Sequence, residues 1–188
     1  SFDNLEQINL CEMENLRFKV ETVTSSKLKG TTWEDVDVGD IAMIFISYGR
    51  IVSHLQFLYV IDGKFSPSVR HGDLIENLEI IKLDYPSEYL IGINGRHGIF
   101  GTDRVLKSIT FVTNKNSYGP FPKNKPTYMG SEDTEFNINA LDYGWLNGFH
   151  GTICGNQLES FGVNIKPMPI ITTPKKDIDY EKIDVIEC

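Results

Sequence analysis

The chain has 188 residues, 40% of them apolar, which is enough for one well-buried core and little more. Its formal net charge of -8 argues against a nucleic-acid partner, because an acidic chain repels phosphate backbones. No apolar run reaches about 18 residues, so the sequence predicts no membrane span and no membrane partner.

The two ends of the chain lack the pattern of a packed core. Residues 1–16 are acidic and have apolar side chains at a loosely helical spacing, which is typical of an N-terminal extension or linker. Residues 168–188 are rich in Pro, Lys and Asp, and we interpret them as a C-terminal tail. A single domain over residues 17–167 is therefore expected.

Between these ends, short runs that alternate polar and apolar residues, or are densely apolar, predict strands. Residues 30–39 around Trp33 are interpreted as an acidic loop, and Gly49-Arg50 separates two apolar runs as a hairpin turn would. The predicted strands are residues 17–23, 41–48, 51–61, 79–84, 88–93, 105–113, 134–139, 145–150 and 159–166. Their spacing, with no crossover helix between them, predicts an all-β fold.

Several phrases in this part of the chain resemble the jacalin-related lectins, and they occur in the order of that family. They are Trp33-Glu34-Asp35, Ile44-Phe45-Ile46-Ser47-Tyr48-Gly49, Leu83-Asp84-Tyr85-Pro86-Ser87-Glu88-Tyr89-Leu90, Ile93-Asn94-Gly95-Arg96-His97-Gly98, Ser108-Ile109-Thr110-Phe111-Val112-Thr113-Asn114, Tyr118-Gly119-Pro120-Phe121, Gly148-Phe149-His150-Gly151 and Leu158-Glu159-Ser160-Phe161-Gly162-Val163. The resemblance runs from about Arg17 to Pro167, which is most of the chain.

The resemblance implies a β-prism I fold, in which three four-stranded Greek-key sheets surround a pseudo-threefold axis. It also implies binding of mannose- or galactose-type sugars without a metal ion or other cofactor, and we expect no enzymatic activity. Mannose-type members are mostly uncleaved plant proteins of the cytoplasm and nucleus. This chain is similar to that group, because Cys11, Cys154 and Cys188 are odd in number and widely spaced, which favours a reducing compartment.

The predicted carbohydrate-binding loop is Gly155-Asn156-Gln157-Leu158-Glu159. A sugar hydroxyl both donates and accepts, so a carboxylate beside backbone N–H groups of a glycine-containing loop can bind it. In the family this is a Gly-x-x-x-Asp loop, which the segment matches in length and in its glycine. A further family loop corresponds to Gly95, Arg96 and His97, and places the Arg and His at the rim beside a second sugar.

Two departures from the family pattern affect this site. The carboxylate is Glu159 rather than Asp, and the extra methylene moves its oxygens by about 1.5 Å, the length of one C–C bond. Family members also have a first-loop glycine whose backbone N–H touches the sugar, and the corresponding residues 23–29 contain none. A site held by short hydrogen bonds tolerates such changes poorly.

Two functions are expected on this basis. The first is a lectin domain of plant defence that binds mannose- or glucose-containing glycans. The alternative is a protein-interaction module of plant pathogen resistance, on the same scaffold with a degenerate sugar site. The sequence is compatible with homo-oligomers.

His150 and Cys154, four positions apart, would be a nucleophile and its base in an enzyme. On a hairpin they have no third residue to orient them, so we interpret them as core or loop residues. The four histidines are scattered without the spacing of metal ligands, and no metal site is predicted.

Overall fold

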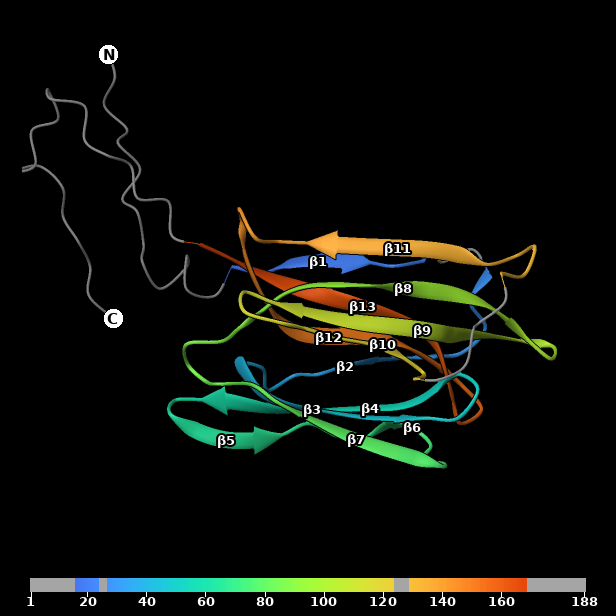
Figure 1. Ribbon diagram of the computed structural model, residues 1–188, viewed down its shortest axis with the longest axis horizontal. Coiled ribbons are helices and arrows are strands. Elements are labelled where there is room, and N and C mark those ends of the chain that lie inside the picture. Colours follow the sequence, from blue (N-terminus) through green and yellow to red (C-terminus); the bar gives the residue numbers. More distant parts are fainter. Residues whose placement is uncertain (1–15, 24–26, 124–128, 169–188) are drawn as a thin grey trace, which may run out of the picture.

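The computed structural model describes residues 16–23, 27–123 and 129–168 (Figure 1). Within these ranges, thirteen strands form three antiparallel sheets. No helix in them is long and apolar enough to cross a membrane. The predicted extension over residues 1–16 and the predicted tail over 168–188 lie outside the described residues, except for Leu16 and Met168.

The three sheets are named here A, B and C. Sheet A has the order β1-β13-β12-β2 and consists of β1 (Phe18–Glu21), β2 (Thr31–Glu34), β12 (Gly144–Cys154) and β13 (Gln157–Pro167). Sheet B has the order β5-β4-β3-β7, with β6 paired to β4, and consists of β3 (Asp40–Tyr48), β4 (Val52–Ile61), β5 (Lys64–Pro67), β6 (His71–Gly72) and β7 (Asn77–Lys82). Sheet C has the order β10-β9-β8-β11 and consists of β8 (Leu90–Phe100), β9 (Asp103–Thr113), β10 (Ser117–Phe121) and β11 (Thr134–Asn139). In Figure 1, sheet B forms the lower side of the molecule.

The core lies where the inner faces of the sheets meet. Alternate side chains of each long strand point inward, as Ile44 and Ile46 of β3 do, and both are fully buried. Phe57 of β4 stacks on Phe149 of β12 with ring centroids 3.8 Å apart, and Phe149 lies 5.2 Å from Phe161 of β13. Aromatic side chains of this size dominate core energetics, so this stack holds sheets A and B together.

The prediction of an all-β prism of three sheets is confirmed, and a hairpin forms at Gly49-Arg50, with Tyr48 opposite Val52, so that its turn also includes Ile51. One detail is corrected. Sheet B has five strands rather than four, because the two-residue β6 pairs with β4.

The acidic loop predicted around Trp33 contains a strand. Residues 31–34 form β2 and pair with β12, with Trp33 opposite Gly151. A run of four residues followed directly by an acidic turn is too short to show an alternating pattern. Pairing with the long strand β12 therefore determines that these residues form a strand.

Candidate functional site

β12 and β13 form a long hairpin whose turn contains the predicted loop. The turn itself consists of Gly155 and Asn156, since Gln157 already pairs with β12. Gly155 has a φ of 61°, a left-handed conformation that glycine adopts without strain. Leu158 and Glu159 lie in β13 and are buried, the latter 2% exposed. The expected five-residue loop is therefore a two-residue turn followed by the start of a strand.

The carboxylate of Glu159 is engaged by three donors of the same chain. The backbone N–H of Lys29 donates to Oε1 at 2.7 Å, and the N–H of Gly30 donates to Oε2 at 2.8 Å. The hydroxyl of Thr152 also donates to Oε2, at 2.7 Å. A carboxylate offers about four lone-pair positions, so most of its accepting capacity is used inside the protein.

These donors also determine the charge of Glu159. Burial by itself would raise the pKa of the carboxyl group. The N–H of Lys29, the hydroxyl of Thr152 and the N–H of Gly30 together outweigh burial and hold the pKa below its usual value. Glu159 is therefore ionised at neutral pH although it is buried.

Gly30 is a glycine of the first loop that the sequence analysis missed, because it lies one position beyond residues 23–29. A Cβ there would lie 2.4 Å from the carbonyl oxygen of Ile153 and 2.7 Å from Oε2 of Glu159. Only glycine lets the backbone come this close to the hairpin. The signal that could have identified it is its place three residues before Trp33, at the start of the family's first phrase.

Gly95, Arg96 and His97 do not form a rim loop. They lie inside β8, which pairs with β9 on one side and β11 on the other. A Cβ at Gly95 would lie 2.1 Å from the carbonyl oxygen of Ser108, so this glycine serves the sheet. Arg96 is half-buried with its Nε 3.8 Å from Oδ2 of Asp133. His97 is fully buried, so the predicted rim position is wrong for it.

His97 instead connects sheet C to sheet A. Its Nε2 lies 2.7 Å from the hydroxyl of Thr22, which also hydrogen bonds to the carbonyl of Phe161. Burial lowers the pKa of His97 to about 4, so the ring is neutral at pH 7. It is a structural contact between sheets.

The interpretation of His150 and Cys154 as non-catalytic agrees with their placement. Both lie on β12, and four residues of extended strand span about 14 Å. In the described ranges, no group of three or more His, Cys, Asp or Glu side chains is placed to hold a metal ion.

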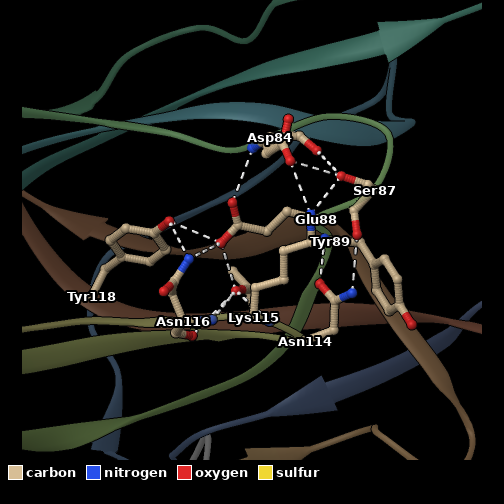
Figure 2. Close-up of polar contacts among 9 residues, drawn as sticks. Asp84, Ser87, Glu88, Tyr89, Asn114, Lys115, Asn116 and Tyr118 are labelled. Atoms are coloured by element: carbon tan, nitrogen blue, oxygen red, sulfur yellow. Dashed lines mark hydrogen bonds and ion pairs between the residues drawn. The ribbon is translucent and has the colours of Figure 1, made fainter.

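A second buried carboxylate, Glu88, lies in the connection between β7 and β8 (Figure 2). It accepts from the backbone N–H of Asp84 at 2.9 Å and from the hydroxyls of Thr113 and Tyr118 at 2.7 and 2.8 Å. The amide of Asn116 donates to it at 3.1 Å. Burial would raise the pKa of Glu88, but these four donors together lower it. The hydrogen-bonding capacity of the Glu88 carboxylate is thus used by donors of the same chain, and these bonds hold the surrounding loops in place.

The structure has the features that the family resemblance implies. It has three sheets in a prism, and a hairpin with the Gly-x-x-x-acid pattern of Gly155 and Glu159 that contacts the first-loop glycine Gly30. The sequence profile of the jacalin-like lectin domain matches residues 22–164. The chain belongs to the jacalin-like lectin family. Members of this family bind carbohydrates, and the predicted resemblance is confirmed.

Several known proteins resemble the chain over most of its length. The protein RESTRICTED TEV MOVEMENT 1 of Arabidopsis thaliana is 32% identical over 166 residues, which cover 85% of this chain and 91% of that protein. The structure of AcmJRL, a mannose binding jacalin related lectin from Ananas comosus, matches with a TM-score of 0.64 and 25% identity, covering 81% of this chain and 98% of that one. The artocarpin-mannotriose complex matches with a TM-score of 0.61 and 28% identity, covering 72% and 89%.

Proposed function

We propose that this jacalin-like lectin domain binds mannose- or glucose-type glycans at the turn of the β12–β13 hairpin. The observation that carries the proposal is the contact between Gly30 and Glu159, which meet at 2.8 Å although they are 129 residues apart. A backbone donor and a carboxylate acceptor, the two groups that hold a sugar hydroxyl, are thereby assembled in one place. The mannose-binding lectin from Ananas comosus and the artocarpin-mannotriose complex support this class of sugar.

A sugar that binds here has to displace hydrogen bonds that the protein already makes within itself. The N–H groups of Lys29 and Gly30 donate to Glu159, so a hydroxyl that inserts there replaces hydrogen bonds that already exist. The net gain from each such exchange is small, about 0.5–1.5 kcal/mol. We therefore expect a monosaccharide to bind in the millimolar range, about -4 kcal/mol.

Titration calorimetry with methyl α-mannoside tests the proposal. In Glu159→Asp the carboxylate withdraws by about 1.5 Å, which frees the N–H groups of Lys29 and Gly30 for the sugar. We expect tighter binding by about tenfold, or about 1.4 kcal/mol. Glu159→Ala removes the acceptor and should abolish binding.

The control is Glu135→Asp, the same change at an exposed position of β11. It should leave the affinity unchanged. Circular dichroism of each variant shows whether it is folded. If neither the wild-type protein nor Glu159→Asp binds any sugar on a glycan array, the proposal is refuted.

The second candidate is a protein-interaction module of plant defence in which the sugar site stays closed. It is favoured by the burial of Glu159 and by the three internal donors that engage it. The relative from Arabidopsis thaliana, named for restricted TEV movement, supports a defence role.

A pull-down from plant extract with and without excess free mannose separates the two candidates. A captured partner that withstands both mannose and Glu159→Ala favours the interaction module, whereas elution by mannose favours the lectin. We propose a cytoplasmic or nuclear location for either function, which imaging of the fluorescently tagged protein would check.

A further inference from the structure

The outer face of sheet A has a hollow of about 1120 Å³. Its wall includes side chains from all four strands of the sheet. Those used below are Lys19, Glu21, Glu34, His150, Thr152 and Ser160. The hollow begins beside the Glu159 site, because the hydroxyl of Thr152 both lines it and donates to Glu159.

His150 lies against the sheet on this face. It is opposite Gly162 in the β12–β13 pair and opposite Glu34 in the β12–β2 pair. A Cβ at Gly162 would lie 2.2 Å from Cε1 of the imidazole, so only glycine lets the ring lie flat on the strand. The side chain of His150 is thereby buried at the wall of the hollow.

One nitrogen of this ring has no partner. Nε2 of His150 is buried and makes no hydrogen bond within the described part of the chain. Nδ1 lies 3.6 Å from Oε1 of Glu21. With the proton on the nitrogen that faces a carboxylate, Nε2 is an acceptor. Buried acceptors are rarely left without a donor in folded proteins, so this atom points to a missing donor.

The charges around His150 leave the ring neutral at pH 7. Burial lowers its pKa. Glu21, Glu34 and a backbone hydrogen bond with Val163 oppose this effect, and Lys19 adds to it, with a net lowering. A neutral ring has one acceptor nitrogen to offer, in agreement with the geometry.

Two ion pairs lie in the wall of the hollow. Lys19 is 3.0 Å from Glu34, and Arg104 is 3.8 Å from Glu132. An ionic ligand would have to break such a pair, whereas a neutral ligand would not. The hydroxyl of Ser160, 2.8 Å from that of Thr152, adds a group that can donate or accept, whereas the proton of Thr152 is already donated to Glu159.

We propose that this hollow is a second carbohydrate site, which takes a short neutral oligosaccharide and accepts one of its hydroxyl protons at Nε2 of His150. The site is separate from the carboxylate of Glu159. His150 lies two residues along β12 from Thr152, about 7 Å, so the two sites share one wall. The proposal goes beyond the function proposed above and does not require Glu159 to bind sugar.

The test is a titration of the whole chain with mannotriose, followed by NMR of ¹⁵N-labelled histidine. We expect the Nε2 resonance of His150 to shift and saturate, while that of His54, in sheet B, stays constant. Calorimetry on His150→Phe, which keeps a flat ring without a nitrogen acceptor, should show about three- to tenfold weaker binding. His150→Gln, with an amide oxygen, should restore part of the loss.

Two further arms separate the possible outcomes. In Glu159→Ala, mannotriose should still shift the His150 resonance. We expect this result whether or not the Glu159 site binds sugar. Trigalacturonic acid, a charged trisaccharide of similar size, should cause no shift. The proposal is overturned if mannotriose does not shift the His150 resonance. If binding that depends on Glu159 is observed in the same experiment, the site at Glu159 remains supported. An equal response to trigalacturonic acid would refute the neutral class of ligand.

Discussion

Two glutamates of this protein are ionised in its interior, and each is stable because donors of the chain surround it. Glu88 has four donors, three of them from side chains close to it in space on β9, β10 and their connection. Glu159 has three, two of them backbone N–H groups. Removing such an acceptor leaves one buried donor and several partly buried donors unpaired, which costs more than the net value of the hydrogen bonds.

Glu88→Ala should therefore reduce the free energy of unfolding by about 1–3 kcal/mol, measured by urea denaturation, because the buried hydroxyl of Thr113 loses its acceptor and the partly buried bonds of Asn116 and Tyr118 are lost with it. Asp84→Asn is the control, since that carboxylate forms an exposed ion pair with Lys115 at 2.9 Å. Its effect should be much smaller. Equal losses in the two variants would contradict the role assigned to Glu88.

At this scale the sequence predicted the acceptor of the site but not its donors. Glu159 was identifiable from the Gly-x-x-x-acid spacing of the hairpin. Lys29 and Gly30 act through backbone N–H groups, which every residue except proline has, so no side-chain pattern marks them. The extra methylene of Glu159 suggested a carboxylate displaced from the position of the family's Asp. The structure shows that the longer side chain reaches the backbone N–H groups of Lys29 and Gly30.

At the scale of elements, strand lengths depend on neighbours more than on pattern. β8 was expected to end at Ile93 because Asn94, Gly95 and Arg96 interrupt the apolar run. It continues to Phe100, since β9 and β11 supply hydrogen bonds on both sides. The long hairpin of β3 and β4, in contrast, was predictable because two dense apolar runs flank a turn at Gly49-Arg50.

Gly95 belongs to this ladder, and Gly95→Ala tests that assignment. The added methyl group meets Ser108 at 2.1 Å and Phe136 at 2.8 Å, so we expect a loss of about 1–3 kcal/mol in thermal or urea unfolding. The affinity for sugar should not change. Gly63→Asn is the control, at a turn with a φ of 72° and nothing within 4 Å. A variant with full stability but lost sugar binding would return Gly95 to the site.

At the scale of the whole molecule, His97 joins two sheets through its contact with Thr22, and the burial of its ring makes stability depend on pH. The pKa of His97 is about 4 in the folded protein, below the 6.5 of an unperturbed histidine. Between these values the unfolded chain binds more protons, so stability is complete above about pH 6.5 and falls as the pH drops toward 4. The loss over this range is about 3 kcal/mol.

Urea unfolding at intervals from pH 7 to pH 4.5 measures this dependence. His97→Gln has no titrating ring and should show a flatter profile between pH 6.5 and 5. Glu88 and Glu159 have lowered pKa values, so their contribution is lost only below about pH 4.5 and does not overlap this window. Parallel profiles for the two proteins would refute the assignment to His97.

The fold was more predictable than the site at this scale. Many sequence segments that resemble the family occur in the family's order, and together they specify three sheets. A mismatch in any one segment leaves the prediction from the other segments intact. The proposed binding depends on a few atoms, and the donors at Lys29 and Gly30 and the unpaired nitrogen of His150 are set by contacts across the prism.

The pairing of β1 with β13 has a consequence for the order in which the protein is made. As the chain leaves the ribosome, sheets B and C can form from strands close together in sequence, but β1 waits for β13, the last strand to emerge. Contacts over such separations form late because loop closure has to precede them. The meeting of Gly30 with Glu159 belongs to this final step, so a nascent chain acquires the proposed glycan site only when translation of the domain is complete.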